Sequence, residues 1–189
     1  MDNVQTGKLR NVCLLGHGRT GKSTLAEAML YKSGATEACG SVENGSSVSD
    51  YDPEEIKRKF SINTSVMPLE WKGVKINLID TPGYFDFAGA VCEGVRAADA
   101  AVIAVSGKSG VAVGTELAFR RVREKKIPCI FYVNKLDDEK SDYFKVLEQL
   151  KETFGKSVAP FSIPVKDGDH FNGFISVVKQ TMRTFDGNK

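Results

Sequence analysis

Residues 16–23 constrain the fold of this chain more than any other segment. Their sequence, Gly16-His17-Gly18-Arg19-Thr20-Gly21-Lys22-Ser23, matches G-x-x-x-x-G-K-[ST]. An apolar run at 9–15 precedes them, and apolar residues at helical spacing follow at 24–31. A strand, a glycine-rich turn and a helix in this order form a loop whose backbone N–H groups hold phosphate oxygens. This flanking pattern argues against a chance glycine-rich turn.

Each residue of the segment has an expected task in holding a nucleoside triphosphate. Lys22 supplies positive charge to the β- and γ-phosphates, and the same charge stabilises the transition state of phosphoryl transfer, so we expect Lys22 to be catalytic. The Ser23 hydroxyl is an expected ligand of Mg²⁺. The other expected nucleotide-binding residues here are Gly16, His17, Gly18, Arg19, Thr20, Gly21 and Thr24.

The composition is that of an ordinary soluble, globular domain. Of the 189 residues 41% are hydrophobic and 26% are charged, and this length suffices to bury a core. The net charge of +2 is too small to indicate nucleic-acid binding, and we expect no DNA partner. Apolar runs are strand-sized, so we expect no membrane contact. The N-terminus carries no secretory signal and the four cysteines form no C-x-x-C pair, which favours a cytoplasmic protein with reduced thiols. We also expect a monomer.

Strand and helix patterns alternate along the chain. The alternation predicts an α/β fold with a mostly parallel, six-stranded sheet, helices on both faces and one antiparallel edge hairpin. Ligands of such sheets bind beyond the carboxyl ends of the strands, so strands that end at Gly16, Asp80 and Asn134 bring the candidate residues to one edge. The expected strands are 9–15, 61–71, 74–80, 99–106 and 127–134, and the expected helices are 22–32, 88–97, 113–125 and 143–154.

Two segments have weaker patterns. Residues 34–59 are rich in glycine, serine and charge but have no period, and a long unstructured stretch inside a domain is typically functional or disordered. Residues 157–189 contain two strand candidates, 158–165 and 171–178. The prolines of the first candidate suit a sheet edge, because proline cannot donate to a neighbouring strand.

The expected strand 74–80 ends in Asp80-Thr81-Pro82-Gly83. A carboxylate at this place binds Mg²⁺, usually through water. The Gly83 N–H can approach a γ-phosphate, because glycine has no side chain to block it. Alone, D-x-x-G also fits a plain turn; its position after a strand and downstream of the phosphate-binding segment favours the nucleotide site.

The expected strand 127–134 ends in Asn134-Lys135-Leu136-Asp137, a pattern that recognises guanine. The Asp137 carboxylate accepts from guanine N1–H and from the exocyclic amine, whereas adenine would leave it unpaired at a cost of about 1–3 kcal/mol. Asn134 braces the loop, and the aliphatic stem of Lys135 covers a face of the base. The alternative is a helix cap, since Asp137 and Asp138 precede a helical segment.

Together these motifs resemble those of translational GTPases, most closely the G domain of elongation factor G. The resemblance covers nearly the whole chain and implies the fold of a P-loop NTPase G domain. It implies a G domain at 1–156 and, at 157–189, the incomplete start of the insertion that this family carries, in a truncated form of a longer protein. The matching residues are Gly21-Lys22-Ser23-Thr24-Leu25, Leu30-Tyr31-Lys32-Ser33-Gly34, Asp80-Thr81-Pro82-Gly83, Asp86-Phe87, Asn134-Lys135-Leu136-Asp137 and Phe171-Asn172-Gly173-Phe174-Ile175.

The chain departs from the family pattern at three residues that matter for catalysis. Tyr84 stands where the family has a histidine that orients the attacking water; a phenol also hydrogen-bonds to water but has a different shape. Ser61 stands where a threonine binds Mg²⁺, and it keeps the hydroxyl. Arg19 stands where an aspartate faces the phosphates; its guanidinium either contacts the phosphates in place of a monovalent cation, as an arginine finger would, or points into solvent. The family's Ser-Ala motif for guanine O6 does not occur.

The resemblance implies an enzyme that binds GTP and GDP with Mg²⁺ and hydrolyses GTP, slowly without the ribosome, as a ribosome-associated switch. Switch I (residues 34–62) and switch II (residues 80–90) would order around the γ-phosphate. Ribosomal RNA and stalk proteins are the implied partners, mostly through further domains. Tetracycline ribosome-protection and release-factor GTPases are alternatives within the family. A GTP-binding module with little hydrolysis, because of Tyr84, and an ATP-using kinase are alternatives outside it.

Overall fold

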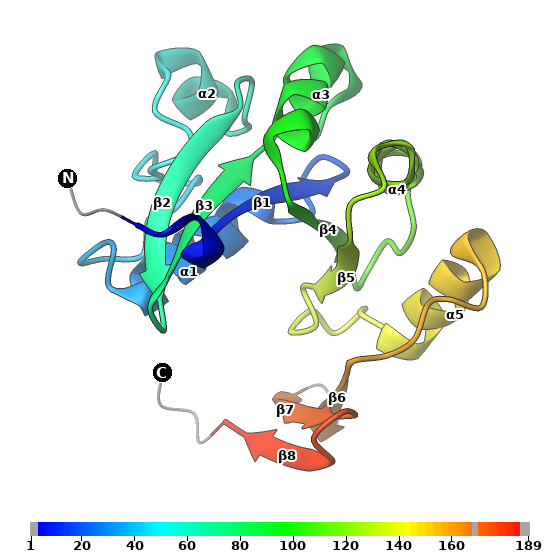
Figure 1. The fold of residues 1–189 in the computed structure, drawn as a ribbon. Helices are drawn as coiled ribbons and strands as arrows, with labels where there is room; N and C mark the ends of the chain where they lie inside the picture. Colours follow the sequence, from blue (N-terminus) through cyan, green and yellow to red (C-terminus); the bar gives the residue numbers. More distant parts are fainter. Residues whose placement is uncertain (1–3, 168–169, 186–189) are drawn as a thin grey trace. The chain divides into compact units, whose positions relative to one another are not determined.

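The computed structural model describes residues 4–167 and 170–185. The described residues form two units, 4–105 with 112–132 and 106–111 with 133–167 and 170–185. Figure 1 shows the elements along the chain: η1 (Thr6–Lys8), β1 (Leu9–Gly16), α1 (Lys22–Ser33), α2 (Pro53–Arg58), β2 (Ser65–Trp71), β3 (Val74–Asp80), η2 (Phe85–Phe87), α3 (Ala88–Ala97), β4 (Ala100–Ser106), α4 (Val113–Lys125), β5 (Cys129–Asn134), α5 (Tyr143–Phe154), β6 (Ser162–Asp167), β7 (His170–Ser176) and β8 (Thr181–Thr184).

The main sheet has the strand order β2-β3-β1-β4-β5. β1 lies parallel to β3 on one side and to β4 on the other. β2 runs antiparallel to β3 and pairs Trp71 with Val74. The hairpin turn between them needs two residues with positive φ, and Lys72 and Gly73 have φ of 51° and 76°. The predicted α/β fold with an antiparallel edge hairpin is confirmed.

Alternating residues of β1 explain why helices cover both faces of this sheet. Cys13 and Leu15 belong to a core cluster with apolar residues of α3 and α4. Leu14, between them, belongs to a second cluster with residues of α1 and β2. Successive side chains of a strand point to opposite faces, so one buried strand serves two cores. Such burial on both faces is typical of parallel sheets.

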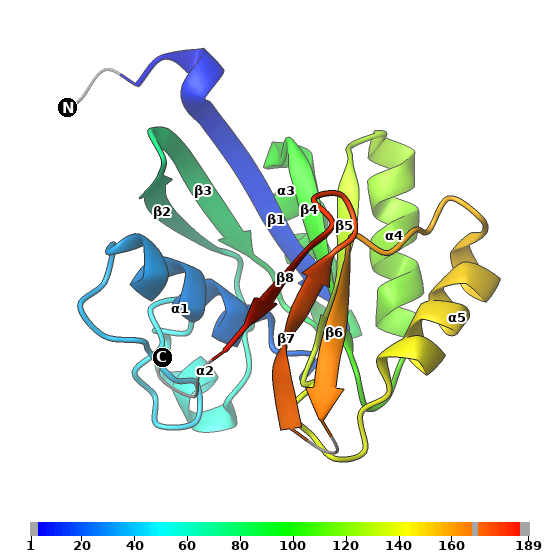
Figure 2. The ribbon, with the colours of Figure 1, turned by 90° about the horizontal axis from the view of Figure 1, so that it is seen from below.

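The main sheet of the described chain has five strands rather than the predicted six. β6 lies instead at the edge of a three-stranded antiparallel sheet, β6-β7-β8, which Figure 2 shows from below. Its Pro164 lies opposite Phe174 of β7, in agreement with the edge position that the prolines predicted. The third strand of this small sheet, β8, was not predicted, because four residues are too few to show a period.

The segment 34–59 contains more structure than its sequence predicted. Asp52 caps α2: its carboxylate accepts from the Glu54 N–H at 2.8 Å, and the Glu55 carboxylate accepts from the Asp52 N–H at 3.2 Å. This reciprocal capping, with Pro53 at the first helical position, is readable in the sequence Asp-Pro-x-Glu. The following strand, β2, begins at Ser65 and not at residue 61.

Most of the other predicted helices and strands begin and end within two residues of their predicted bounds. α3, α4 and α5 have the predicted bounds, and β1 and α1 each run one residue further. Among the residues described, no helix combines the length and apolar character needed to cross a membrane.

Candidate nucleotide-binding site

The motif 16–23 forms the connection between β1 and α1. Gly16 and Gly21 have φ of 134° and 89°, and a Cβ at Gly16 would collide with the carbonyl oxygen of Ala104. The Thr20 hydroxyl donates to the carbonyl oxygen of His17 at 2.9 Å and holds the loop closed. Glycine is therefore required at the start of the loop, and the loop leads directly into the N-terminus of α1.

Lys22 is a buried cation within this loop. The residue is only 6% exposed, and Nζ donates to the carbonyl oxygens of Gly16 and His17, both at 3.2 Å. Burial lowers the pKa of the Lys22 ammonium, while the charges of Asp80 and Asp50 raise it. The loop thus holds the Lys22 Nζ where phosphate oxygens are expected, and a phosphate there would add a further negative charge that raises its pKa.

Two hydroxyls and a carboxylate meet beside Lys22. Ser23 Oγ and Ser61 Oγ lie 3.2 Å apart, which brings the first turn of α1 to the end of switch I. Asp80 is 2% exposed, and neither of its carboxylate oxygens has a hydrogen-bond partner within the described part of the chain. Burial raises the pKa of Asp80 to about 6, against the opposing effects of the Lys22 ammonium and the Ser23 hydroxyl. Oxygen ligands of this kind are those that Mg²⁺ prefers.

Asp50 is a fourth oxygen donor of this group, and the sequence analysis missed it. The residue is 3% exposed, and its Oδ2 has no partner among residues 4–167 and 170–185. Burial raises the pKa of Asp50, whereas the Ser61 hydroxyl lowers it. Its charge also acts on Lys22 and on Asp80. No local pattern distinguishes Asp50 from the exposed acids of the same long loop, so only the fold identifies it.

Two buried glutamates hold switch I in place, and neither was predicted. Glu27 of α1 accepts through Oε1 from the Ser47 hydroxyl at 2.9 Å and from the Val48 N–H at 2.7 Å. Glu55 of α2 accepts through Oε1 from the N–H groups of Ile62 and Asn63, at 2.8 and 2.9 Å. These bonds lie on either side of Asp50 and Ser61 along the chain.

Gly83 and Tyr84 lie directly against the phosphate-binding loop. A Cβ at Gly83 would come within 2.5 Å of Lys22 Nζ and 2.8 Å of Gly18 N, so only glycine fits there. The Tyr84 ring covers Gly18, where a Cβ would lie 3.1 Å from Cζ of the ring. The Phe60 ring also packs against Tyr84, with 4.8 Å between ring centroids. Residues from the loop, switch I and switch II therefore meet at one place.

The remaining loop residues have more ordinary surroundings. The His17 ring lies 5.7 Å from that of Phe85, and its Nδ1 has no hydrogen-bond partner in the described chain. Arg19 is exposed, with φ of 63°. Lys59 is the main group that lowers the pKa of Glu43, and Arg19 adds to this effect from the loop. Thr24 is exposed on the first turn of α1.

The guanine motif lies in the other unit, at the end of β5. The Asn134 carbonyl accepts from the Gly107 N–H at 2.7 Å, and Lys135 has φ of 60°. Asp137 is exposed and makes no hydrogen bond to the residues described. The N-cap of α5 is Asp142, whose carboxylate accepts from the Lys145 N–H at 3.0 Å. Asp137 does not cap that helix, which removes the alternative interpretation of the motif.

The structure thus brings the predicted residues together in two groups, each within one unit. The first contains the loop 16–24 with Ser61, Asp80, Gly83 and Tyr84. The second contains Asn134, Lys135 and Asp137.

Comparison with known proteins gives consistent matches over this chain. The family model "Elongation factor Tu GTP binding domain" matches residues 7–185. Elongation factor G 1 of Syntrophomonas wolfei is 37% identical over 180 residues, which cover 95% of this chain and 27% of that protein. The elongation factor G-like protein of Thermotoga maritima is 34% identical over 181 residues, covering 96% and 26%. Mitochondrial ribosome-releasing factor 2 of Danio rerio is 33% identical over 186 residues, covering 98% and 24%.

A solved structure extends the similarity to three dimensions. A crystal structure of a protein from Thermus thermophilus has a TM-score of 0.89 and 40% sequence identity, over 95% of this chain and 27% of that one. The chain spans about a quarter of the length of these relatives.

Proposed function

Because this chain belongs to the elongation factor Tu GTP binding domain family, we propose that it binds GTP and GDP and hydrolyses GTP with Mg²⁺ as cofactor. The observation that carries the proposal is the buried Lys22 ammonium in the loop between β1 and α1, beside the Asp80 carboxylate, which has no hydrogen-bond partner in the described chain. Buried polar groups are normally paired, so the two Asp80 oxygens, which have no partner within the described residues, mark a place for a cation beside the Lys22 ammonium.

Each group of the first unit has a task in this proposal. Lys22 and the loop amides of residues 16–23 bind the phosphates, and the Gly83 N–H faces the γ-phosphate. Ser23, Ser61, Asp80 and Asp50 supply oxygens for Mg²⁺, directly or through water. Both carboxylate oxygens of Asp80 and Oδ2 of Asp50 are buried without a partner among the residues described, which fits a site for that cation. Mg²⁺ supplies positive charge that offsets the charge on the phosphates during transfer to water.

Tyr84 is the residue proposed to orient the attacking water. Its ring packs against both Gly18 and Phe60, which limits where the hydroxyl can point. The same packing supports a second candidate, a GTP-binding module with little hydrolysis, because a confined phenol differs in shape from the histidine of the family.

Asp137 is proposed to select guanine over adenine. Its carboxylate is exposed and free of the helix-capping task, so it can accept from guanine N1–H and from the exocyclic amine. Adenine offers neither donor in that arrangement. This preference separates the proposal from an ATP-using kinase.

The ribosome is the proposed partner of the whole protein. The printed names of the relatives, elongation factor G and ribosome-releasing factor 2, support such a partner for this chain. We also propose the division into a G domain at residues 1–156 and an insertion from 157 onward.

The proposal is tested by Lys22→Ala in a titration with fluorescent GDP and GTP. We expect binding of both nucleotides to be lost while circular dichroism stays unchanged. The matched control is Lys32→Ala, at the exposed end of the same helix, which should bind like the parent. Unchanged binding by Lys22→Ala would refute the nucleotide site.

A further inference from the structure

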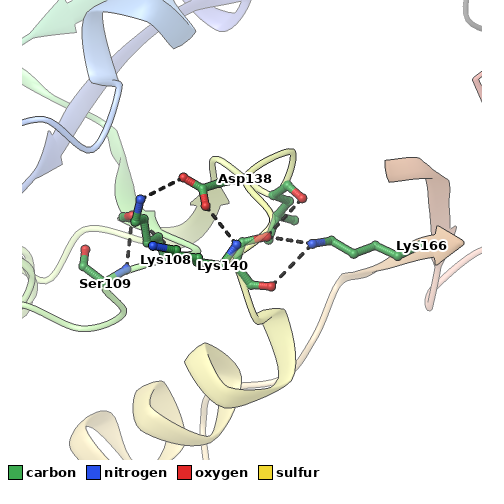
Figure 3. Close-up of polar contacts among 8 residues, drawn as sticks. Lys108, Ser109, Asp138, Lys140 and Lys166 are labelled. Atoms are coloured by element: carbon green, nitrogen blue, oxygen red, sulfur yellow. Dashed lines mark hydrogen bonds and ion pairs between the residues drawn. The ribbon is translucent and has the colours of Figure 1, made fainter. Parts of the chain in front are cut away.

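Lys166 of β6 reaches out of the three-stranded sheet to the loop that follows β5 (Figure 3). Its Nζ lies 2.7 Å from the Ser141 hydroxyl oxygen and 3.4 Å from the Ser141 carbonyl oxygen. Both partners are part-buried. The three-stranded sheet has no task in the proposed function so far, and this contact links it to the guanine motif.

The direction of the hydrogen bonds follows from the chemistry of the groups. An ammonium can only donate, so the Ser141 oxygen accepts from Lys166. The Ser141 hydroxyl has one proton, and it donates this proton to the carbonyl oxygen of Leu136 at 3.1 Å. A hydroxyl that accepts from a cation is polarised and donates more strongly, so the two bonds reinforce each other.

Ser141 also holds the carbonyl on the other side of Asp137. Its backbone N–H donates to the carbonyl oxygen of Asp138 at 2.9 Å. The carbonyls of Leu136 and Asp138 therefore both bind Ser141, and Asp137 lies between them. Because the Leu136 carbonyl and the Asp137 N–H share one rigid peptide plane, a fixed Leu136 carbonyl fixes the plane from which Asp137 projects.

The other contacts of this loop fix Asn134 and the Asp138 side chain, but not the peptide plane between Leu136 and Asp137. The Gly107 N–H fixes Asn134, at the start of the loop, and a Cβ at Gly107 would lie 2.8 Å from Leu136 Cδ2. Lys108 Nζ and the Lys140 N–H bind the carboxylate of Asp138, at 3.1 and 2.9 Å. In the described chain Asp137 itself has no side-chain hydrogen bond, so its direction depends on its backbone.

We propose that Lys166 and Ser141 are positioning residues for guanine recognition: Lys166 orients the Ser141 hydroxyl, and Ser141 holds the peptide planes that aim Asp137 at the base. The inference rests on the proposed binding of guanine nucleotides. It gives the β6-β7-β8 sheet a function, that of supporting the base-recognition loop. Neither residue touches the nucleotide in this account.

The test compares GDP with IDP, which lacks the exocyclic amine and therefore one of the two donors to Asp137. Calorimetric titration of the 189-residue chain gives the ratio of the two dissociation constants, IDP over GDP. We expect this ratio to fall about 3–10-fold in Lys166→Met, which keeps the aliphatic stem but loses the ammonium. A general loss of protein stability would weaken the binding of both nucleotides equally and leave the ratio of their dissociation constants unchanged.

Ser141→Ala removes one oxygen and should lower the ratio to a similar extent. In the double variant we expect no further fall, because both residues act through the same hydrogen bond. Lys179→Met, at an exposed lysine between β7 and β8, is the matched control and should keep the parental ratio. If Lys166→Met does not fold, the ratio measured for Ser141→Ala tests whether this contact positions Asp137.

The outcomes separate the two proposals. A parent chain that binds GDP no more tightly than ADP would refute the proposed guanine site. A parent that prefers GDP to ADP, with a ratio unchanged in Lys166→Met and Ser141→Ala, would refute the positioning role alone.

Discussion

The carboxylate of Glu55 lies against the backbone of Ile62, whose N–H donates to Oε1 at 2.8 Å. The same carboxylate accepts from the N–H groups of Asn63 and Asp52, at 2.9 and 3.2 Å. Ser61 precedes Ile62, so α2 fixes the backbone from which the Ser61 hydroxyl reaches Ser23. One buried carboxylate thus organises the end of switch I.

Removal of this carboxylate should be costly. Glu55→Ala leaves three backbone N–H groups without their acceptor, and we expect the free energy of unfolding to fall by about 2–4 kcal/mol. Urea unfolding followed by circular dichroism measures it. Glu54→Ala, at an exposed residue of the same helix, should change the free energy by less than about 0.5 kcal/mol. Equal effects of the two substitutions would contradict the role given to Glu55.

The buried Asp80 predicts a pH dependence of stability. Its pKa in the folded chain is about 6, against 3.8 as the ordinary value, so the folded state binds more protons than the unfolded state between these values. Protonated Asp80 therefore stabilises the folded state at pH 4. This contribution to the free energy of unfolding decreases as the pH rises to about 6, and it does not change further at higher pH.

The variant Asp80→Asn cannot titrate and should lack this contribution. Between pH 4 and 7, without Mg²⁺, the parent should lose about 2 kcal/mol of its free energy of unfolding relative to the variant. Urea titrations of both proteins across this range provide the measurement. Parallel pH profiles would show that Asp80 does not titrate in this way.

Tyr84 predicts a change in catalysis rather than in binding. We expect Tyr84→His to raise the single-turnover rate of GTP hydrolysis several-fold, because imidazole has the shape of the group that the family uses to orient water. Affinity for GTP should change little. Tyr84→Phe should lower the rate, since it keeps the ring on Gly18 but loses the hydroxyl. If Tyr84→Phe hydrolyses GTP as fast as the parent, the hydroxyl has no part in the reaction.

The position of Arg19 in the phosphate-binding loop leads to a prediction of how GTP hydrolysis responds to monovalent cations. If its guanidinium takes the place of a cation at the phosphates, the single-turnover rate should be equal in potassium and sodium buffers. Arg19→Asp should then lower the rate and introduce a potassium dependence. A parent that already responds strongly to potassium would favour the alternative, in which the exposed Arg19 stays in solvent.

The sequence predicted those parts of the fold and site that depend on local patterns. α4 and α5 were predicted with the bounds that the structure gives them, and a helix was expected near the bounds of α3. The motifs around Lys22 and Asp80 lie together in one unit, as expected for residues that follow neighbouring parallel strands, because the carboxyl ends of such strands meet at one edge. The resemblance to translational GTPases was confirmed by the family match.

The parts that were missed depend on contacts between distant residues. Asp50, Glu27 and Glu55 are buried acids whose neighbours come from other segments, so the sequence around each resembles that of an exposed acid. The main sheet was predicted with six strands and has five among the residues described, because a strand pattern does not specify which sheet the strand joins. Lys166 and Ser141 are 25 residues apart and carry no motif.

The central claim is that Asp137 recognises guanine. A substitution that changes the preferred base tests this claim most directly. Asp137→Asn replaces one carboxylate oxygen, an acceptor, by an amide NH₂ group, a donor. We therefore predict that GTP binding weakens by about 1–3 kcal/mol, and that the variant binds xanthosine triphosphate more tightly than the parent does. Competition titrations with fluorescent GDP measure both affinities. An Asp137→Asn variant that binds GTP as tightly as the parent, with no gain for xanthosine triphosphate, would contradict the account.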